Sequence, residues 1–424
     1  MTEHLVVLSN GKVMGEIKKD QRSRLSFIYH RNWQEAVGAY PLSLSMPLIM
    51  AEHEHAKIEP WLWGLLPDND GILARWGQKY QVSPRNVFAL LSHVGEDCAG
   101  AIQIVLPERV ESLVANPTGA VEWLSDNDIA DRLKMLRKDQ GAWRTDRDTG
   151  QFSLAGAQPK TAFFYQNGRW GVPSGRLPTT HIIKPSNQAF DGQAENEHVC
   201  LSLAREIGLP AATSEVRSFD GEVAIVVERY DRIWVDETIY RLHQEDICQA
   251  LGIHPTMKYE NQGGPGVQSV AQLLQTYSTS PLEDLWTFVE ALAFNWVIGG
   301  TDAHAKNYSI LISDGRIRLA PLYDISSTLP YDFDFKKLRL AMKIGSKYLL
   351  DDISLPDWRK LTSLLRLDQE QFHDRCLGLI DRIPDALSAV LMTARSNGIQ
   401  HDVLEDLAKA LNARTDRCRK VLLS

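Results

Sequence analysis

The chain has 424 residues, a size at which proteins usually divide into two or more packed units. Hydrophobic residues make up 44% of it and charged residues 24%, the balance of an ordinary globular protein. The net charge of −8 and the pI near 5.9 exclude a surface that coats nucleic acid throughout, although a local basic patch would be compatible with DNA contact.

The cysteines and the N-terminus indicate the compartment. The five cysteines are scattered and form no Cys-x-x-Cys pair, which is typical of small buried side chains in a reducing environment. The first residues lack the basic start and the long apolar run of a signal peptide, and no window approaches 18 consecutive apolar residues. We therefore expect a cytoplasmic protein without a membrane span.

The first part of the chain has the pattern of a small mixed unit. Alternating apolar and polar residues over 1–30 predict an antiparallel sheet. Residues 41–50 and 58–69 are rich in Pro and Trp and predict irregular segments with short helices. Residues 83–95 predict a helix with a Ser-Pro start, and residues 100–108 predict a strand that closes the unit.

The pattern then changes from strands to helices. Residues 121–139 predict a strand and an amphipathic helix, and strand patterns dominate from 151 to about 235, with one clear helix at 195–208. After residue 241 the patterns are mainly helical. We therefore predict an α+β, bilobal fold with a cleft between a β-rich lobe and a helical lobe. The expected domains are residues 1–110, 111–240 and 241–424.

The most informative motif lies at residues 299–312, directly after an apolar helix. Asp302 is followed five positions later by Asn307 and then by a short strand, which is the Asp-x-x-x-x-Asn spacing of a kinase catalytic loop. In such a loop the aspartate accepts the proton of the attacking hydroxyl, and the asparagine oxygen binds magnesium. Seventeen residues after Asn307 comes Asp324, placed like the second magnesium-binding aspartate of a kinase.

Two other interpretations of these residues stay open at this point. Asp302 could be an ordinary turn residue, and Asp324 could cap the segment that follows it. A metal hydrolase could use Asp302, His304 and Asp324 as ligands, although the sequence has no further ligand cluster at metal-binding spacing. In a kinase, His304 would instead orient the loop.

In a kinase, the residues that bind the nucleotide should lie upstream of this motif. Residues 152–164 predict a strand, a turn of small residues and a second strand, and backbone N–H groups of such a turn can bind phosphate. Lys184 ends a buried-looking strand, where a kinase places its phosphate-binding lysine, although it could also extend to solvent. Glu195 and Glu197 could pair with it or favour the helix N-terminus. Residues 226–232 follow a strand and precede the helical lobe, and we predict that they form the hinge whose backbone bonds adenine.

Taken together, these blocks resemble the HipA family of bacterial toxin kinases. The matching blocks include PLSLSMPL, WLWGLLPDN, HVGEDCAGAIQI, FSLAGAQPKTA, HIIKPS, AENEHVCLSLAREIGL, ERYDR, RLHQEDICQALG, GGTDAHAKN and LAPLYDISS. The resemblance covers nearly the whole chain. It implies a kinase-like fold remote from eukaryotic kinases, with an extra N-terminal subdomain, and ATP and Mg²⁺ as cofactors.

The resemblance also implies roles for individual residues. Asp302 would be the catalytic base, and Asn307 and Asp324 would bind magnesium. The hinge would run through Glu228 and Tyr230. The residues implied to contact ATP are Ala155, Gly156, Ala157, Gln158, Lys160, Lys184, Glu228, Tyr230, Gln244, His304, Lys306, Asn307 and Asp324.

Ser153 matches the serine at which these kinases phosphorylate themselves, which expels the phosphate loop and inactivates the enzyme. Two added charges in a phosphate-binding loop would repel ATP. Without the resemblance, Ser153 would be an ordinary turn serine. Pro159 departs from the family, whose members commonly carry glutamate there. Because proline removes a backbone donor and restricts φ, we expect loop mobility and ATP affinity to differ.

The resemblance further implies partners. These are a HipB-like helix-turn-helix antitoxin dimer, operator DNA contacted mainly through that antitoxin, and a protein substrate among the aminoacyl-tRNA synthetases, with glutamate–tRNA ligase the best-known class. Two other functions stay open, a small-molecule kinase of the same architecture and a degenerate kinase that only bridges an antitoxin and DNA.

Overall fold

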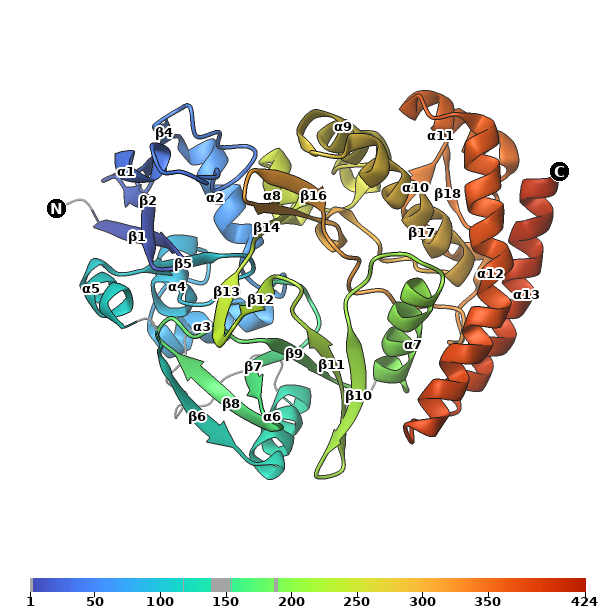
Figure 1. Ribbon diagram of the computed structural model, residues 1–424, viewed down its shortest axis with the longest axis horizontal. Coiled ribbons are helices and arrows are strands. Elements are labelled where there is room, and N and C mark those ends of the chain that lie inside the picture. The colour runs from blue at the N-terminus through green and yellow to red at the C-terminus, as the bar shows by residue number, and fades with distance from the viewer. Residues whose placement is uncertain (1–2, 117, 139–152, 154, 187–189) are drawn as a thin grey trace. The chain divides into compact units, whose positions relative to one another are not determined.

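Figure 1 shows the computed structural model, which describes residues 3–116, 118–138, 153, 155–186 and 190–424. The chain forms two compact units, each built from segments that are distant in sequence. Unit 1 comprises Met1–Pro185, Ser218–Thr256 and Ile310–Ile317, and unit 2 comprises Ser186–Arg217, Met257–Ser309 and Arg318–Ser424. The three domains predicted with boundaries near residues 110 and 240 stay a prediction.

Unit 1 begins with the expected antiparallel sheet, whose strand order is β4-β3-β2-β1-β5. Alternate residues of β1, such as Leu5 and Val7, point into the core, and β1 pairs with β2 through Leu5 opposite Ile17. The strands are β1 (Glu3–Ser9), β2 (Lys12–Lys19), β3 (Leu25–Tyr29), β4 (Glu52–His53) and β5 (Ile102–Val105). The sequence pattern over residues 1–30 therefore predicted this sheet correctly.

Short helices pack against this sheet or, in one case, against another helix. They are α1 (Arg31–Gln34), α2 (His55–Gly64), α3 (Asp70–Tyr80), which packs against α4, α4 itself (Val87–Val94) and α5 (Pro107–Ala115). The start predicted for α4 at Ser83-Pro84 is wrong by several residues. The helix begins at Val87 because the side chain of Asn86 caps it, accepting the backbone N–H of Ala89 at 3.1 Å.

A second sheet, which lies in unit 1 except for the first part of β10, has the order β10-β11-β9-β7-β8-β6. Its strands are β6 (Ala120–Leu124), β7 (Thr161–Gln166), β8 (Arg169–Ser174), β9 (His181–Pro185), β10 (Ser214–Phe219) and β11 (Glu222–Glu228). Helix α6 (Asp126–Lys138) packs against β9 and β11. The strand predicted before the small-residue turn is not seen at Ser153 or Ala155, and residues 139–152 and 154 lie outside the described residues.

The remaining elements of unit 1 follow β11. They are the hairpin β12 (Arg232–Val235) and β13 (Thr238–Arg241), then β14 (His243–Asp246) and helix α8 (Ile247–Leu251). A three-stranded sheet joins β14 to β15 (Ser309–Ser313) and β16 (Arg316–Leu319) in the order β14-β15-β16, and both β15 and β16 span the boundary with unit 2. Asp246 caps α8 in a capping box with Gln249, which explains the sharp change from strand to helix.

Glu245 on β14 is a buried carboxyl group, and it makes the stability of unit 1 depend on pH. Its Oε1 accepts the backbone N–H of Leu44 at 2.8 Å, and burial raises the pKa of Glu245 to about 8. Because the pKa in the folded state lies above that in the unfolded chain, the stabilisation is complete in acid and is lost as pH rises toward 8.

We expect the free energy of unfolding to fall between pH 5 and pH 8, by at most about 1.4 kcal/mol per pH unit from this group. Glu245→Gln is uncharged throughout and should remove that slope. Urea unfolding at several pH values measures it, with the exposed Glu237→Gln as the matched control. A slope equal in wild type and Glu245→Gln would contradict the assignment.

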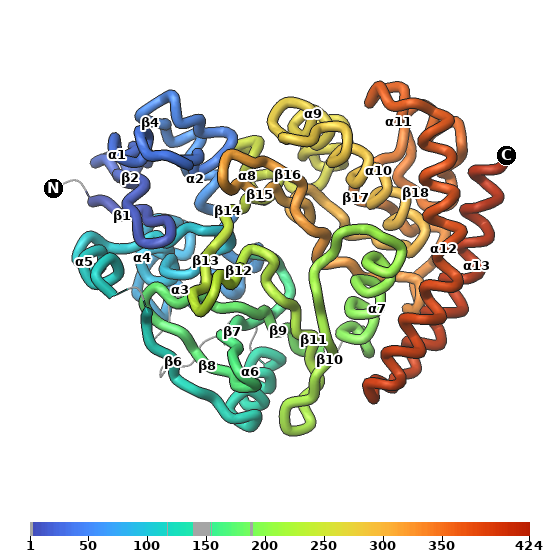
Figure 2. The backbone as a smooth tube through the Cα atoms, viewed as in Figure 1, coloured from blue at the N-terminus to red at the C-terminus, as the bar shows by residue number. Residues whose placement is uncertain are grey.

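Unit 2 is mainly helical. Its helices are α7 (Gln193–Glu206), α9 (Val267–Tyr277), α10 (Pro281–Ile298), α11 (Leu355–Leu365), α12 (Gln369–Ser396) and α13 (Val403–Leu423). Helix α12 packs against α7, α10 and α13, and Figure 2 shows α12 and α13 running alongside each other. None of the helices in the described part of the chain combines the length and apolar character needed to cross a membrane.

Short elements complete unit 2. They are the hairpin β17 (Arg339–Ile344) and β18 (Lys347–Leu349), and the 3₁₀ turns η1 (Pro255–Met257), η2 (Glu260–Gln262), η3 (Ala305–Asn307) and η4 (Phe335–Lys337), of which η1 spans the boundary with unit 1. Strand β17 contacts η2, α9 and α11. The ring centroids of Trp296 and Trp358 lie 5.5 Å apart in the core of this unit.

Candidate active site

The loop that carries Asp302 is set by the end of α10. The helix ends at Gly299, which has φ +66°, and a Cβ there would lie 2.7 Å from the side chain of Leu329. In the loop itself, the backbone oxygen of Asp302 accepts the backbone N–H of His304 and the side-chain Nδ2 of Asn307, both at 2.8 Å. The spacing of five residues therefore closes a compact turn around the backbone of Asp302.

Asp324 lies on a second segment that is fixed on both sides. It adopts a left-handed backbone conformation with φ +56°, which is uncommon for a residue with a side chain. Before it, the hydroxyl of Tyr323 donates to the backbone oxygen of Lys306 at 2.6 Å. After it, Asn196 of α7 exchanges two hydrogen bonds with the backbone of Ser327, at 2.8 and 3.0 Å. Asp324 thus lies between two anchored neighbours.

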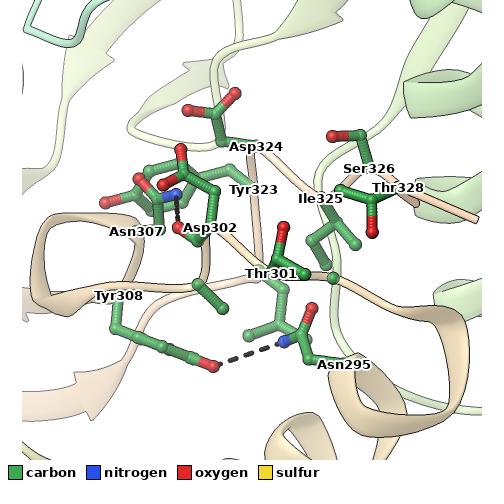
Figure 3. Close-up of a pocket in the computed structure, with 13 residues that line it drawn as sticks. Asn295, Thr301, Asp302, Asn307, Tyr308, Tyr323, Asp324, Ile325, Ser326 and Thr328 are labelled. Atoms are coloured by element: carbon green, nitrogen blue, oxygen red, sulfur yellow. Dashed lines mark hydrogen bonds between the residues drawn. The ribbon is translucent and has the colours of Figure 1, made fainter. Parts of the chain in front are cut away.

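Asp302, Asn307 and Asp324 line one pocket within unit 2, together with residues that include Asn295, Thr301 and Ser326. Figure 3 shows the side chains of Asp302, Asn307 and Asp324 grouped at the same side of this pocket. The structure therefore brings together the three residues that the sequence spacing singled out.

The atoms presented by these side chains suit a hard cation. Asn307 uses its carboxamide nitrogen to hold the loop, so its oxygen is the atom that can serve as a ligand. One carboxamide and one or two carboxylates, completed by phosphate oxygens, are a donor set that magnesium accepts. Among the residues that the structure describes, no three His, Cys, Asp or Glu side chains are grouped to hold a metal. The hydrolase interpretation of Asp302, His304 and Asp324 therefore lacks a ligand set.

His304 and Lys306 belong to this loop, and both are buried. Burial lowers the pKa of His304, against the opposing effect of the nearby carboxylates of Asp302 and Asp324. The ring of His304 packs edge-on against the ring of Tyr259 at 4.9 Å between centroids and so supports the loop from within. Contacts of His304 and Lys306 with ATP stay a prediction.

One residue at this site was not predicted from the sequence. The hydroxyl of Tyr259 donates a hydrogen bond to Oδ1 of Asp302 at 2.7 Å, and its ring packs edge-on against His304 at 4.9 Å. Tyr259 precedes Asp302 by 43 residues, and no periodic pattern connects the two. The available signal was the Gly263-Gly264 pair, which marks a tight turn beside Tyr259.

In unit 1, Lys184 occupies a buried position on β9, opposite Ile225 of β11. Its side chain is only 5% exposed, so it does not extend into solvent. The predicted role of Lys184 in holding phosphate stays a prediction. Glu195 and Glu197 begin α7 in unit 2 and are both buried.

The predicted phosphate loop is anchored at several points of unit 1. Gly156 has φ +106°, and its carbonyl accepts the backbone N–H of Asp68 at 3.2 Å. Lys160 donates from Nζ to the carbonyl of Ala155 at 2.8 Å, so this lysine holds the turn itself. Ser153 is buried, and its hydroxyl donates to the carbonyl of Leu65 at 2.8 Å.

The predicted hinge follows the end of β11. Glu228 lies opposite His181 in the antiparallel pairing of β11 with β9. The next residue, Arg229, donates its backbone N–H to the carbonyl of Thr180 at 2.9 Å. The hydroxyl of Tyr230 is hydrogen-bonded to Oε1 of Gln244. The structure therefore brings Tyr230 and Gln244 together, two residues implied to contact ATP that are separated in sequence.

A buried ionic network supports this hinge, and sequence reasoning missed it. Asp97 accepts hydrogen bonds from Arg232 at 3.0 Å and from Arg241 at 3.3 Å, and Asp231 pairs with Arg229 at 2.9 Å. Burial alone would raise the pKa of Asp97, but the neighbouring arginines outweigh burial and hold it well below its usual range. The motif ERYDR thus contributes charged residues to the interior, and the hinge role of Tyr230 stays a prediction.

Comparison with known proteins decides the family. A model of the HipA-like C-terminal domain matches residues 152–387, more than half of the chain, and a model of the HipA N-terminal domain matches residues 5–105. The chain belongs to the HipA family. The family resemblance predicted from the sequence blocks is therefore confirmed.

Two relatives and one solved structure match along almost their whole length. "Putative kinase Y4mE" of Sinorhizobium fredii is 35% identical over 394 residues, covering 90% of each protein. "Serine/threonine-protein kinase toxin HipA" of Shewanella oneidensis is 28% identical, covering 90% of this chain and 87% of the relative. A solved structure of Shewanella oneidensis HipA with HipB and operator DNA aligns with a TM-score of 0.83 at 25% identity, covering 98% of this chain and 99% of the other.

These matches confirm the predicted fold class and activity. The chain has the mixed α+β fold of HipA kinases, with a β-rich N-terminal region and a helical C-terminal part. It is a serine/threonine kinase of the HipA family, and the family implies that it uses ATP.

Proposed function

We propose that this HipA-family kinase is the toxin of a toxin–antitoxin pair and arrests growth by phosphorylating a translation component. The observation that carries the proposal is the pocket lined by Asp302, Asn307 and Asp324. Phosphoryl transfer requires a base beside the attacking hydroxyl and groups that hold the metal near the phosphates. This pocket has suitable side chains for both tasks.

The roles of the residues follow from their chemistry. Asp302 accepts the proton of the attacking serine or threonine hydroxyl, since its carboxylate is exposed at the loop while its backbone is held by Asn307. Asn307 and Asp324 bind Mg²⁺ through oxygen atoms. When bound, that ion neutralises the negative charge of the phosphates.

We propose that residues of unit 1 bind the nucleotide. Lys184 would contact phosphate, Glu228 and Tyr230 would form the hinge, and Gln244 would hold Tyr230 by the hydrogen bond between them. The turn at residues 155–158, together with Lys160, would bind phosphate through backbone N–H groups. Pro159 interrupts that turn, and we expect it to limit the number of backbone donors there.

Autophosphorylation of Ser153 is proposed as the inactivating step. Its hydroxyl is buried and donates to the carbonyl of Leu65, while its backbone N–H donates to the backbone carbonyl of Asp97 at 3.0 Å. A phosphate cannot donate that hydrogen bond, and its charge would be desolvated in this position. Phosphorylation would therefore expel Ser153 and the turn that follows it.

The partners are proposed from the relatives. The Shewanella HipA structure contains HipB and operator DNA, and the matching relative is named as a kinase toxin. We propose a HipB-like helix-turn-helix antitoxin for this chain, with operator DNA bound mainly through the antitoxin. We propose that the substrate is an aminoacyl-tRNA synthetase such as glutamate–tRNA ligase. We also propose that the kinase acts in the cytoplasm.

The proposal is tested by incubating a bacterial lysate with Mg-ATP and either the wild-type chain or Asp302→Asn, followed by phosphopeptide mass spectrometry. Only the wild type should produce a new phosphoserine or phosphothreonine on an aminoacyl-tRNA synthetase, and Ser153 should itself carry phosphate. Expression of the wild type should also arrest growth, and expression of Asp302→Asn should not. Phosphate transfer to a small molecule with no labelled protein would contradict the proposal and favour a small-molecule kinase.

A further inference from the structure

A segment between η1 and α9 places a tyrosine hydroxyl on the carboxylate of Asp302. Tyr259 donates to Oδ1 of Asp302 at 2.7 Å, and both residues belong to unit 2. In a kinase, this carboxylate is the group that receives the proton of the attacking hydroxyl. Whatever holds its oxygens therefore affects the geometry of the transfer.

Contacts on both sides hold the Tyr259 segment independently of Asp302. The carboxylate of Glu260 accepts the backbone N–H of Lys343 on β17 at 2.7 Å and pairs with the Lys343 ammonium at 3.1 Å. The carbonyl of Lys258 accepts the backbone N–H of Ala305 at 3.3 Å. The segment is thus joined to β17 on one side and to the catalytic loop on the other.

The turn after Tyr259 is closed tightly by glycine. Gln262 and Gly264 both donate their backbone N–H groups to the carbonyl of Tyr259, at 3.1 and 3.0 Å. A Cβ on Gly264 would overlap the carbonyl of Met257, and Gly263 has φ +90°. The chain folds back on itself here, so the backbone of Tyr259 has little freedom to move its hydroxyl away.

The side chain of Asp302 needs this support because the hydrogen bonds within its own loop hold only its backbone. Its carbonyl is held by Asn307 and His304, but its side chain is exposed. An exposed carboxylate rotates among rotamers, and a general base works only within hydrogen-bonding reach of the hydroxyl it deprotonates. A charge-assisted hydrogen bond from a rigidly held phenol selects one orientation.

We propose that Tyr259 is a positioning residue for this kinase, one that fixes the Asp302 carboxylate so that its other oxygen receives the proton of the attacking hydroxyl. The proposal rests on the proposed function, in which Asp302 is the base. Tyr259 touches neither the nucleotide nor the acceptor in this role. It should therefore affect the maximal rate of transfer and not the concentration of ATP that half-saturates the enzyme.

The test uses the full chain and labelled phosphate from γ-³²P-ATP incorporated into the chain itself. Tyr259→Phe removes only the hydroxyl and should lower the maximal rate about tenfold, the effect of losing one hydrogen bond to a charged group. The half-saturating ATP concentration should stay at the wild-type value. Tyr277→Phe, at a tyrosine of α9 that is 44% exposed, is the matched control and should behave as wild type.

A second variant keeps the test decisive if Tyr259→Phe does not fold. Glu260→Ala removes the anchor to Lys343 without touching Asp302, and it should lower the maximal rate severalfold at an unchanged half-saturating ATP concentration. A Tyr259→Phe rate equal to or above that of an active wild type would overturn the inference, the higher rate meaning that the phenol competes with the acceptor. Absence of transfer by the wild type would instead overturn the proposed function.

Discussion

Replacing Asp302 by asparagine should lower the maximal rate of phosphate transfer by about a thousandfold, within the range that general-base catalysis contributes. Asparagine has the same shape and its oxygen can still accept the hydroxyl of Tyr259, but it cannot take up a proton. The hydrogen bonds that close the loop use the backbone oxygen of Asp302 and stay intact. The loss should therefore appear in the rate and not in stability.

The measurement is the rate of ³²P incorporation over a range of ATP concentrations, together with thermal unfolding of the same preparations. Asp332→Asn is the matched control, because it changes the charge of another exposed carboxylate of unit 2 by the same amount. Transfer by Asp302→Asn within tenfold of wild type would show that another group accepts the proton. An equal fall in the control would point to overall charge as the cause.

Replacing Asp97 by asparagine should destabilise unit 1 by about 3–5 kcal/mol, the typical effect of removing one partner from a buried ion pair. Three arginines, Arg229, Arg232 and Arg241, face the two carboxylates of Asp97 and Asp231 in the interior. The substitution leaves three buried positive charges against one carboxylate. It also weakens the acceptor for Thr179, whose hydroxyl donates to Asp97 at 2.7 Å.

Urea unfolding with a probe in unit 1 measures this effect. Asp20→Asn is the matched control, since Asp20 pairs with Arg24 at 3.2 Å on the surface of the same unit, where ion pairs contribute little. Its free energy of unfolding should change far less than that of Asp97→Asn. A similar, small change in both variants would mean that the network around Asp97 relaxes or admits water when one charge is lost.

Several features followed from local sequence alone. The loop from Asp302 to Asn307 closes through a contact across five residues, so its compact form follows from local sequence, while its catalytic role stays a prediction. Strand alternation at residues 1–30 predicted the first sheet, because side chains in a strand alternate between its faces. The start of α4 was predicted too early because a Ser-Pro pair and an Asn cap both favour a helix start, and the Asn86 side chain makes the capping bond.

Tertiary structure alone decided which distant residues support the site. Tyr259 bonds to Asp302 across 43 residues of sequence, and Arg232 bonds to Asp97 across 135. No periodic pattern in a sequence connects residues so far apart. The hydroxyl of Ser153 donates to the carbonyl of Leu65, 88 residues away in the sequence. The sequence by itself therefore determined the family and singled out the Asp-x-x-x-x-Asn motif, since both depend on residue types in order. The supports of that motif depend on packing between segments, which only the folded chain brings within hydrogen-bonding distance.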